Sequence, residues 1–193
     1  MSLIRVVVEG PTDAALIFQL LPDEIADQCE FYLAGGKHSV ASVARTHLTR
    51  YPEPVLIVAD ADNTNAEQIN EERQLMQYFV AQAAAEERFR IIFAIPEIET
   101  LYFSDRHALG GWLGIEITEA EAVRAEFVPK TVLHQLLQRS KLAVRTSSEE
   151  LVELLSDEML EAMRQHPLVH EIETLLEELT EQFRSFSEAG VAS

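Results

Sequence analysis

The sequence predicts an α/β fold in which an open parallel sheet of about four strands is flanked by helices and followed by a helical C-terminal extension. Short apolar runs alternate with helix-like patterns along the first half of the chain, which is the order of elements in a parallel sheet. The runs are apolar throughout rather than at every second residue, as expected for strands buried on both faces. After Pro96 only helical patterns follow.

Four apolar runs predict the strands, and three helical segments lie between them. The first run is rich in β-branched residues, and Pro96 closes the fourth. Thr64 and Glu67 have the spacing of a capping box and predict the start of the third helix. The strands are predicted at 3–8, 30–34, 55–59 and 91–95, and the helices at 13–21, 40–50 and 64 to about 88.

The second half of the chain is predicted to be helical. Ser147 and Glu150 again have capping-box spacing, and Pro167 breaks the helix that they open. Further helical patterns cover 97–103, 118–127 and 131–139. We therefore expect an α/β domain over residues 1–105 and a helical C-terminal region over 106–193, which is acidic from about residue 146.

The last helix is predicted to be amphipathic, with apolar residues three and four positions apart. This stripe has two interpretations. It packs on the protein's own core, which is the commoner case, or it is a docking face for a partner or a second copy of the chain, which would make a dimer. The stripe consists of Leu168, Ile172, Leu175, Leu179, Phe183 and Phe186.

The composition narrows the functional classes. The 193 residues include 33 acidic and 15 basic side chains, a net charge of −18, which repels nucleic acid at long range. Any phosphate contacts must therefore come from the first three quarters of the chain, before the acidic C-terminal part. No apolar stretch could span a membrane and no signal peptide is recognisable, so we expect a cytoplasmic protein. The single cysteine, Cys29, excludes a disulfide framework.

Carboxylates follow three of the four predicted strands. The carboxyl ends of parallel strands meet at one edge of the sheet, so these acids are expected to lie close together. Side chains two apart in an extended segment point the same way, so both aspartates after the third strand can face one ion. Oxygen ligands of this kind suit Mg²⁺ or Mn²⁺, although acids at helix starts also occur without any metal. The candidates are Glu9, Asp13, Asp60, Asp62, Glu97 and Glu99.

The segments VVVEGPTDAALI and VLIVADAD resemble the Toprim domain, and in particular the nucleases of the overcoming-lysogenization-defect (OLD) family. The likeness covers roughly residues 3–103. It implies a Toprim-like sheet in which Glu9, Asp60 and Asp62 hold Mg²⁺ and perform phosphoryl chemistry. It also implies that Asp13 and an acid of the pair Glu97 and Glu99 add further ligands, with the pattern slightly favouring Glu99. A downstream lysine, for which Lys130 is the candidate, would stabilise the transition state.

The modules that accompany this domain elsewhere are not recognisable in the sequence. There is no tyrosine-bearing cleavage domain, no zinc module and no Gly-x4-Gly-Lys-Ser/Thr loop for ATP. The resemblance therefore implies a stand-alone Toprim protein that would work with a separate ATPase. Gly35, Gly36 and Lys37 follow the second strand and could bind a phosphate, although a plain turn is the more ordinary interpretation.

Two functions are compatible with these patterns. The first is a Mg²⁺- or Mn²⁺-dependent nuclease that cleaves DNA or RNA through the acidic cluster, with Glu9, Asp60, Asp62 and Lys130 as its catalytic residues. The alternative is a non-catalytic or partner-dependent module that docks a separate ATPase or another protein through its acidic helical C-terminus. Metal-dependent cleavage that needs the acids would distinguish the first from the second.

Overall fold

A computed structural model describes residues 4–142 and 148–191 of the chain. Its centre is a sheet of four parallel strands in the order β2-β1-β3-β4, which confirms the predicted α/β fold with a parallel sheet. The strands are β1 (Ile4–Val8), β2 (Cys29–Leu33), β3 (Val55–Asp60) and β4 (Phe89–Ala94). All six residues of β3 are buried, which explains why its sequence lacks alternation.

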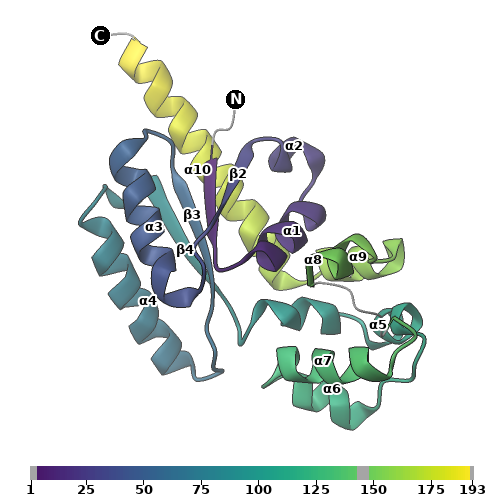
Figure 1. The fold of residues 1–193 in the computed structure, drawn as a ribbon. Helices are drawn as coiled ribbons and strands as arrows, with labels where there is room; N and C mark the ends of the chain where they lie inside the picture. The colour runs from purple at the N-terminus through teal and green to yellow at the C-terminus, as the bar shows by residue number, and fades with distance from the viewer. Residues whose placement is uncertain (1–3, 143–147, 192–193) are drawn as a thin grey trace.

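Helices cover both faces of the sheet (Figure 1). On one face α3 (Lys37–Arg50) and α4 (Ala66–Ala81) pack against Val7, Val55 and other apolar residues of the strands. On the other face α1 (Pro11–Leu20) and α10 (Pro167–Val191) bury the side chains that point the opposite way. The layered arrangement leaves the two ends of the strands as the places where polar side chains can gather.

The remaining helices are short. In Figure 1 helices α5, α6 and α7 lie together beyond the carboxyl ends of the strands, where they can cover that edge of the sheet. The set consists of α2 (Asp23–Ala26), η1 (Glu86–Arg88), η2 (Ile98–Phe103), α5 (Arg106–Leu113), α6 (Glu119–Ala125), α7 (Pro129–Arg139), α8 (Ser148–Glu153) and α9 (Asp157–Arg164). No helix among the described residues is both long enough and apolar enough to cross a membrane.

The apolar stripe of α10 packs on the chain's own core. Leu168, Ile172 and Leu179 are buried in the same cluster as residues of β1 and α1, and Leu175 packs against it. The core is thus continuous across residue 105, so the two predicted regions share it. Phe186, at the end of the stripe, is exposed. Of the two interpretations of this helix, burial against the core is the one that applies through Leu179.

Two helix predictions were wrong in detail. Asn65, not Thr64, caps α4, because its side chain accepts hydrogen bonds from the backbone of Glu67 and Gln68, and the helix ends at Ala81 rather than near residue 88. The single helix expected before Pro167 is two helices, α8 and α9. Ser156 starts the second by accepting a hydrogen bond from the Met159 N–H. Ser147, the expected cap of the first, lies outside the described residues.

Candidate functional site

Four carboxylates from separate segments line one cavity at the carboxyl edge of the sheet, which we call the acidic cavity. Glu9 follows β1, Asp13 lies in the first turn of α1, Asp60 ends β3 and Glu99 lies in η2. The cavity has a volume of about 310 Å³. Among the described residues, Lys130, from the first turn of α7, is the one basic side chain in its lining. The parallel sheet therefore brings these five sequence candidates together across 121 positions of the chain, from residue 9 to residue 130.

Backbone hydrogen bonds fix three of these carboxylates. Glu9 Oε1 accepts the Asp60 N–H at 2.9 Å, which ties the ends of β1 and β3 together. Asp60 Oδ1 in turn accepts the Ile98 N–H at 2.8 Å. Asp13 Oδ2 accepts the Gly10 N–H at 2.9 Å. Each carboxylate thus uses one oxygen to hold the backbone, and its second oxygen accepts no hydrogen bond from any residue of the described ranges.

Burial and the neighbouring charges raise the pKa of two of these acids, Asp60 and Asp13. Burial is the largest cause at Asp60 and brings its pKa to about 8, against the Ile98 hydrogen bond and with the charges of Glu99, Glu9 and Asp13 adding to the rise. Burial likewise raises the pKa of Asp13 to about 6, opposed by the Gly10 hydrogen bond and reinforced by Glu99 and Glu9. Without a cation, these groups lie together at a cost in free energy when ionised.

Glu99 is the acid with an unsatisfied oxygen. Its Oε1 lies 3.3 Å from Lys130 Nζ, but its buried Oε2 has no hydrogen-bond partner among the described residues. A buried oxygen without a partner typically costs about 1–3 kcal/mol, more when it is charged. Lys130 is 64% exposed on its side chain, so it meets solvent as well as Glu99. Burial lowers the pKa of Lys130, but the charge and hydrogen bond of Glu99 outweigh it and raise the value overall.

The donor set fits a hard divalent cation in its chemistry, although it does not form a finished coordination shell. In residues 4–142 and 148–191, no three His, Cys, Asp or Glu side chains already converge as ligands of a metal ion. The four carboxylates nevertheless share the cavity, and the unsatisfied Oε2 of Glu99 is the kind of atom that a cation would bind. Glu9, Asp13, Asp60 and Glu99 are therefore the residues that could hold Mg²⁺ or Mn²⁺.

Asp62 lies apart from this cavity. The strand pairing ends at Asp60, and Asp62 has a left-handed backbone with φ of 58°, so the extended geometry behind the sequence expectation does not reach it. Its Oδ2 is 3.0 Å from Lys37 Nζ, and its side chain is 58% exposed. Asp62 is not among the described residues that line the acidic cavity. The structure therefore separates the two aspartates that the sequence pattern placed together.

Glu97 also lies outside the cavity lining. Its Oε2 accepts the backbone N–H of Lys130 at 3.2 Å, at the start of α7. Glu97 thus helps to hold the helix that carries Lys130, while Glu99 contributes its carboxylate to the cavity itself.

The donors of the predicted phosphate loop are already engaged. The N–H groups of Gly35 and Gly36 both donate to the carbonyl oxygen of Glu9 at 3.0 Å. Both glycines have positive φ, 77° and 124°, a region that residues with a side chain rarely adopt. Lys37 is paired with Asp62 and Glu72. Gly36 does line the acidic cavity, but these two N–H groups point to protein rather than to a ligand.

The apolar and aromatic residues that line the acidic cavity were not predicted from the sequence. Tyr102 lies three residues after Glu99, and Leu133 and Leu137 lie three and seven residues after Lys130, so helical spacing could have placed all three beside their charged neighbours. Leu151 of α8 completes the apolar side of the lining. No local pattern indicates that contact, because α8 reaches the cavity from a distant part of the chain.

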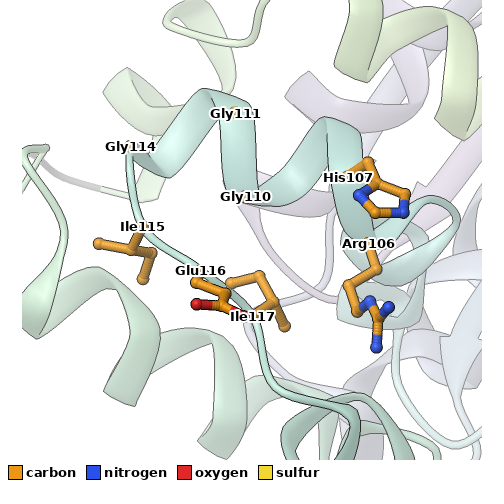
Figure 2. A pocket seen from close by; sticks show the side chains of 8 residues that line it. All are labelled: Arg106, His107, Gly110, Gly111, Gly114, Ile115, Glu116 and Ile117. Atoms are coloured by element: carbon orange, nitrogen blue, oxygen red, sulfur yellow. The ribbon is translucent and has the colours of Figure 1, made fainter.

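A second hollow lies on α5, and none of the described residues that line it also lines the acidic cavity. This open groove has a volume of about 480 Å³. Its lining residues, which include Gly110, Gly111 and Gly114, are labelled in Figure 2. Its charged side chains, Arg106 and Glu116, come from the single segment 106–117. It therefore lacks what distinguishes the acidic cavity, which is a gathering of ionisable groups from several elements.

No family model, no curated protein and no solved structure matches this chain. The resemblance to the Toprim domain therefore rests on the motifs of the sequence, and the function has to be argued from the acidic cavity.

Proposed function

We propose that the protein is a Mg²⁺- or Mn²⁺-dependent nuclease that hydrolyses phosphodiester bonds of DNA or RNA at the acidic cavity. The observation that carries the proposal is the charge imbalance there. Among the described residues, four carboxylates share one cavity with a single lysine, and Glu99 Oε2 is buried without a partner. A divalent cation would offset this imbalance.

Glu9, Asp60 and Glu99 would hold the ion, with Asp13 beside them. A bound ion of this type polarises a phosphoryl oxygen and lowers the pKa of a coordinated water molecule. The hydrogen bonds of Glu9 and Asp60 to backbone N–H groups would keep these carboxylates in place, so little reorganisation would be needed at the moment of reaction.

Two further side chains have properties that suit the chemistry. Asp13 shares the cavity with the carboxylates that would hold the ion, and its own carboxylate can act as a general base. Lys130 is charged and largely exposed, so its ammonium group can approach a phosphate at the mouth of the cavity. In the proposed hydrolysis a water molecule would add to the phosphorus and give one proton to Asp13, while the bond from phosphorus to the leaving oxygen would break and that oxygen would take a proton from solvent. Lys130 would offset the negative charge that develops on the phosphate.

The choice of a phosphodiester as substrate follows from the two motifs that resemble the Toprim family. The partner-dependent alternative was based on the net charge, the few basic residues and the acidic, amphipathic C-terminal region, and the apolar stripe of the last helix is buried through Leu179. A separate ATPase partner and a cytoplasmic location remain predictions. The net charge of −18 opposes nucleic-acid binding, so weak, salt-sensitive substrate affinity is part of the proposal.

The test is cleavage of supercoiled plasmid, single-stranded DNA and structured RNA in the presence of Mg²⁺, Mn²⁺ or EDTA. Asp60→Asn keeps the shape of the side chain and should lower the rate by about 1000-fold, as removal of a central catalytic group does. Asp27→Asn, at the exposed end of α2, is the matched control and should cleave as the natural protein does. Cleavage that persists in EDTA or in Asp60→Asn would refute the proposal.

A further inference from the structure

Lys37 connects the segment after β2 to the segment after β3. Its Nζ lies 3.1 Å from the carbonyl oxygen of Ala61, 3.0 Å from Asp62 Oδ2 and 2.9 Å from Glu72 Oε1. A lysine ammonium has three N–H donors, and these three acceptors can engage all of them. A substrate phosphate could bind Lys37 only by displacing one of its protein partners.

The backbone next to Lys37 is bonded to the end of β1. Ala34 donates its N–H to the carbonyl oxygen of Val8 at 2.9 Å, and Gly35 and Gly36 both donate to that of Glu9 at 3.0 Å. Residues 34–37 therefore form a clamp: the backbone of 34–36 holds the end of β1, and the side chain of Lys37 holds the end of β3. We call residues 34–37 the strand-end clamp.

The strand-end clamp acts on the segment that carries Asp60. On the far side of this segment, Ala61 donates its N–H to Ala94 at 2.9 Å, and Asp62 donates to Pro96 at 2.7 Å. Lys37 holds the same two residues through the Ala61 carbonyl and the Asp62 carboxylate. The chain just after Asp60 is thus fixed from both sides, which limits how the Asp60 and Glu9 carboxylates can move relative to each other.

Charge makes the contacts of Lys37 strong ones. The side chain of Lys37 is 17% exposed and that of Glu72 is 34% exposed, so the pair is partly shielded from solvent. Lys37 also lies 5.9 Å from the centre of the Phe93 ring. Charge-assisted hydrogen bonds of this kind are about twice as strong as neutral ones.

We propose that Lys37 is a positioning residue, which holds the end of β3 against the end of β1 and engages Asp62 as its own partner, so that Asp62 is not a metal ligand. The inference rests on the proposed function, because it assigns roles within that site. It differs from the expectation that Lys37 binds a substrate phosphate and Asp62 binds the ion. A positioning role for Lys37, phosphate binding by Lys37 and metal binding by Asp62 each predict a different outcome on mutation.

The kinetic test compares substitutions at Asp62 and Lys37. Asp62→Asn keeps an oxygen that can accept from Lys37, and asparagine tolerates the left-handed backbone, so kcat should stay within about threefold of the natural value. Lys37→Met should lower kcat about 10-fold or more, as small displacements at a reactive centre do, without weakening Mn²⁺ binding measured by calorimetry. Lys141→Met, an exposed lysine elsewhere, is the control and should change neither quantity.

Two results would overturn the inference, one from metal binding and one from kinetics. If Asp62→Asn weakens Mn²⁺ binding as strongly as Asp60→Asn does, Asp62 is a metal ligand. If Lys37→Met raises KM and leaves kcat unchanged, Lys37 binds the substrate directly.

Hydrogen exchange tests the same inference without any activity, so a failure of the nuclease proposal would not obscure it. Lys37→Met should speed exchange of the Ala61 and Asp62 amides by about 10-fold or more, since local opening is measured by amide exchange. Asp62→Ala, which removes one acceptor, should do the same, whereas Asp62→Asn should not. Unchanged exchange in both Lys37→Met and Asp62→Ala would show that the strand-end clamp does not hold this segment.

Discussion

The two ends of the sheet carry charged clusters, which we call the amino-end cluster and the carboxyl-end cluster, and their proportions of acidic and basic groups differ. At the amino end, Arg5 of β1 lies 3.6 Å from Glu30 and 3.3 Å from Glu53, and its guanidinium group stacks 3.9 Å from the centre of the Tyr51 ring. It also donates a hydrogen bond to the Tyr32 hydroxyl. Here the Arg5 guanidinium group is enclosed by acids and rings, and the side chain is only 11% exposed.

At the carboxyl end the proportions are reversed, because Glu9, Asp13, Asp60 and Glu99 share one cavity with Lys130. The same parallel strands gather charged residues from distant segments at both ends, so clustering alone does not identify a site. The amino-end cluster contributes stability by pairing its charges. The carboxyl-end cluster lowers stability in the absence of a cation, and this imbalance makes it the candidate for binding.

The largest expected effect on stability comes from breaking the amino-end cluster. Arg5→Met removes the charge-assisted hydrogen bond to the partly buried Glu53 and the cation–π contact with Tyr51, so the free energy of unfolding should fall by about 3 kcal/mol. Urea denaturation at pH 7 measures this. Arg124→Met, on the exposed surface of α6, is the control and should change it by less than about 0.5 kcal/mol. An equally small loss in Arg5→Met would mean that the amino-end cluster is not structural.

The next effect is a pH dependence that originates at the carboxyl end. The pKa values of Asp60 and Asp13, about 8 and about 6, lie above the ordinary value of 3.8. Between the ordinary pKa and each raised pKa, the folded state binds more protons than the unfolded state. The stability that these two groups contribute is therefore greatest below about pH 4 and is lost as the pH rises through their raised pKa values. We expect the free energy of unfolding of the metal-free protein to fall continuously from pH 5 to pH 8 through these groups.

Asp60→Asn isolates this contribution. It removes the buried charge while its amide oxygen can still accept the Ile98 N–H, so the variant should be more stable than the natural protein at pH 8 and similar to it at pH 5. Excess Mg²⁺ should stabilise the natural protein at pH 8 and not the variant, because only the former keeps the ligand. A variant that is less stable than the natural protein at pH 8 would contradict the raised pKa of Asp60.

The sequence could predict the sheet and most of the acidic edge because both depend on local patterns. Apolar runs identify buried strands, and the residue after each run must lie at the carboxyl edge once the strands are parallel. Glu9 and Asp60 follow directly from this rule. Asp62 does not, because its direction depends on a left-handed backbone just beyond the strand, where the alternation of side chains no longer holds.

Contacts between distant segments were out of reach for the same reason. The three partners of Lys37 lie 24, 25 and 35 positions further along the chain, and only the packing of α3 and α4 beside β3 brings them together. A lysine after two glycines has the same local sequence whether it binds a phosphate or two carboxylates. The sequence therefore indicates which residues could react, and the fold decides which of them are already paired.

The smallest expected effect tests whether Lys130 of the acidic cavity stabilises the fold as Arg5 does. Lys130 is 64% exposed and touches Glu99 at 3.3 Å, so Lys130→Met should lower the free energy of unfolding by about 1 kcal/mol or less, as for other exposed pairs. Since the charge of Lys130 also lowers the pKa of Asp13, its removal should make the loss of stability between pH 5 and pH 8 slightly steeper. Urea denaturation at both pH values measures the two effects together. A loss as large as that of Arg5→Met would mean that Lys130 balances the acids as Arg5 does, and the contrast between the two ends of the sheet would no longer hold.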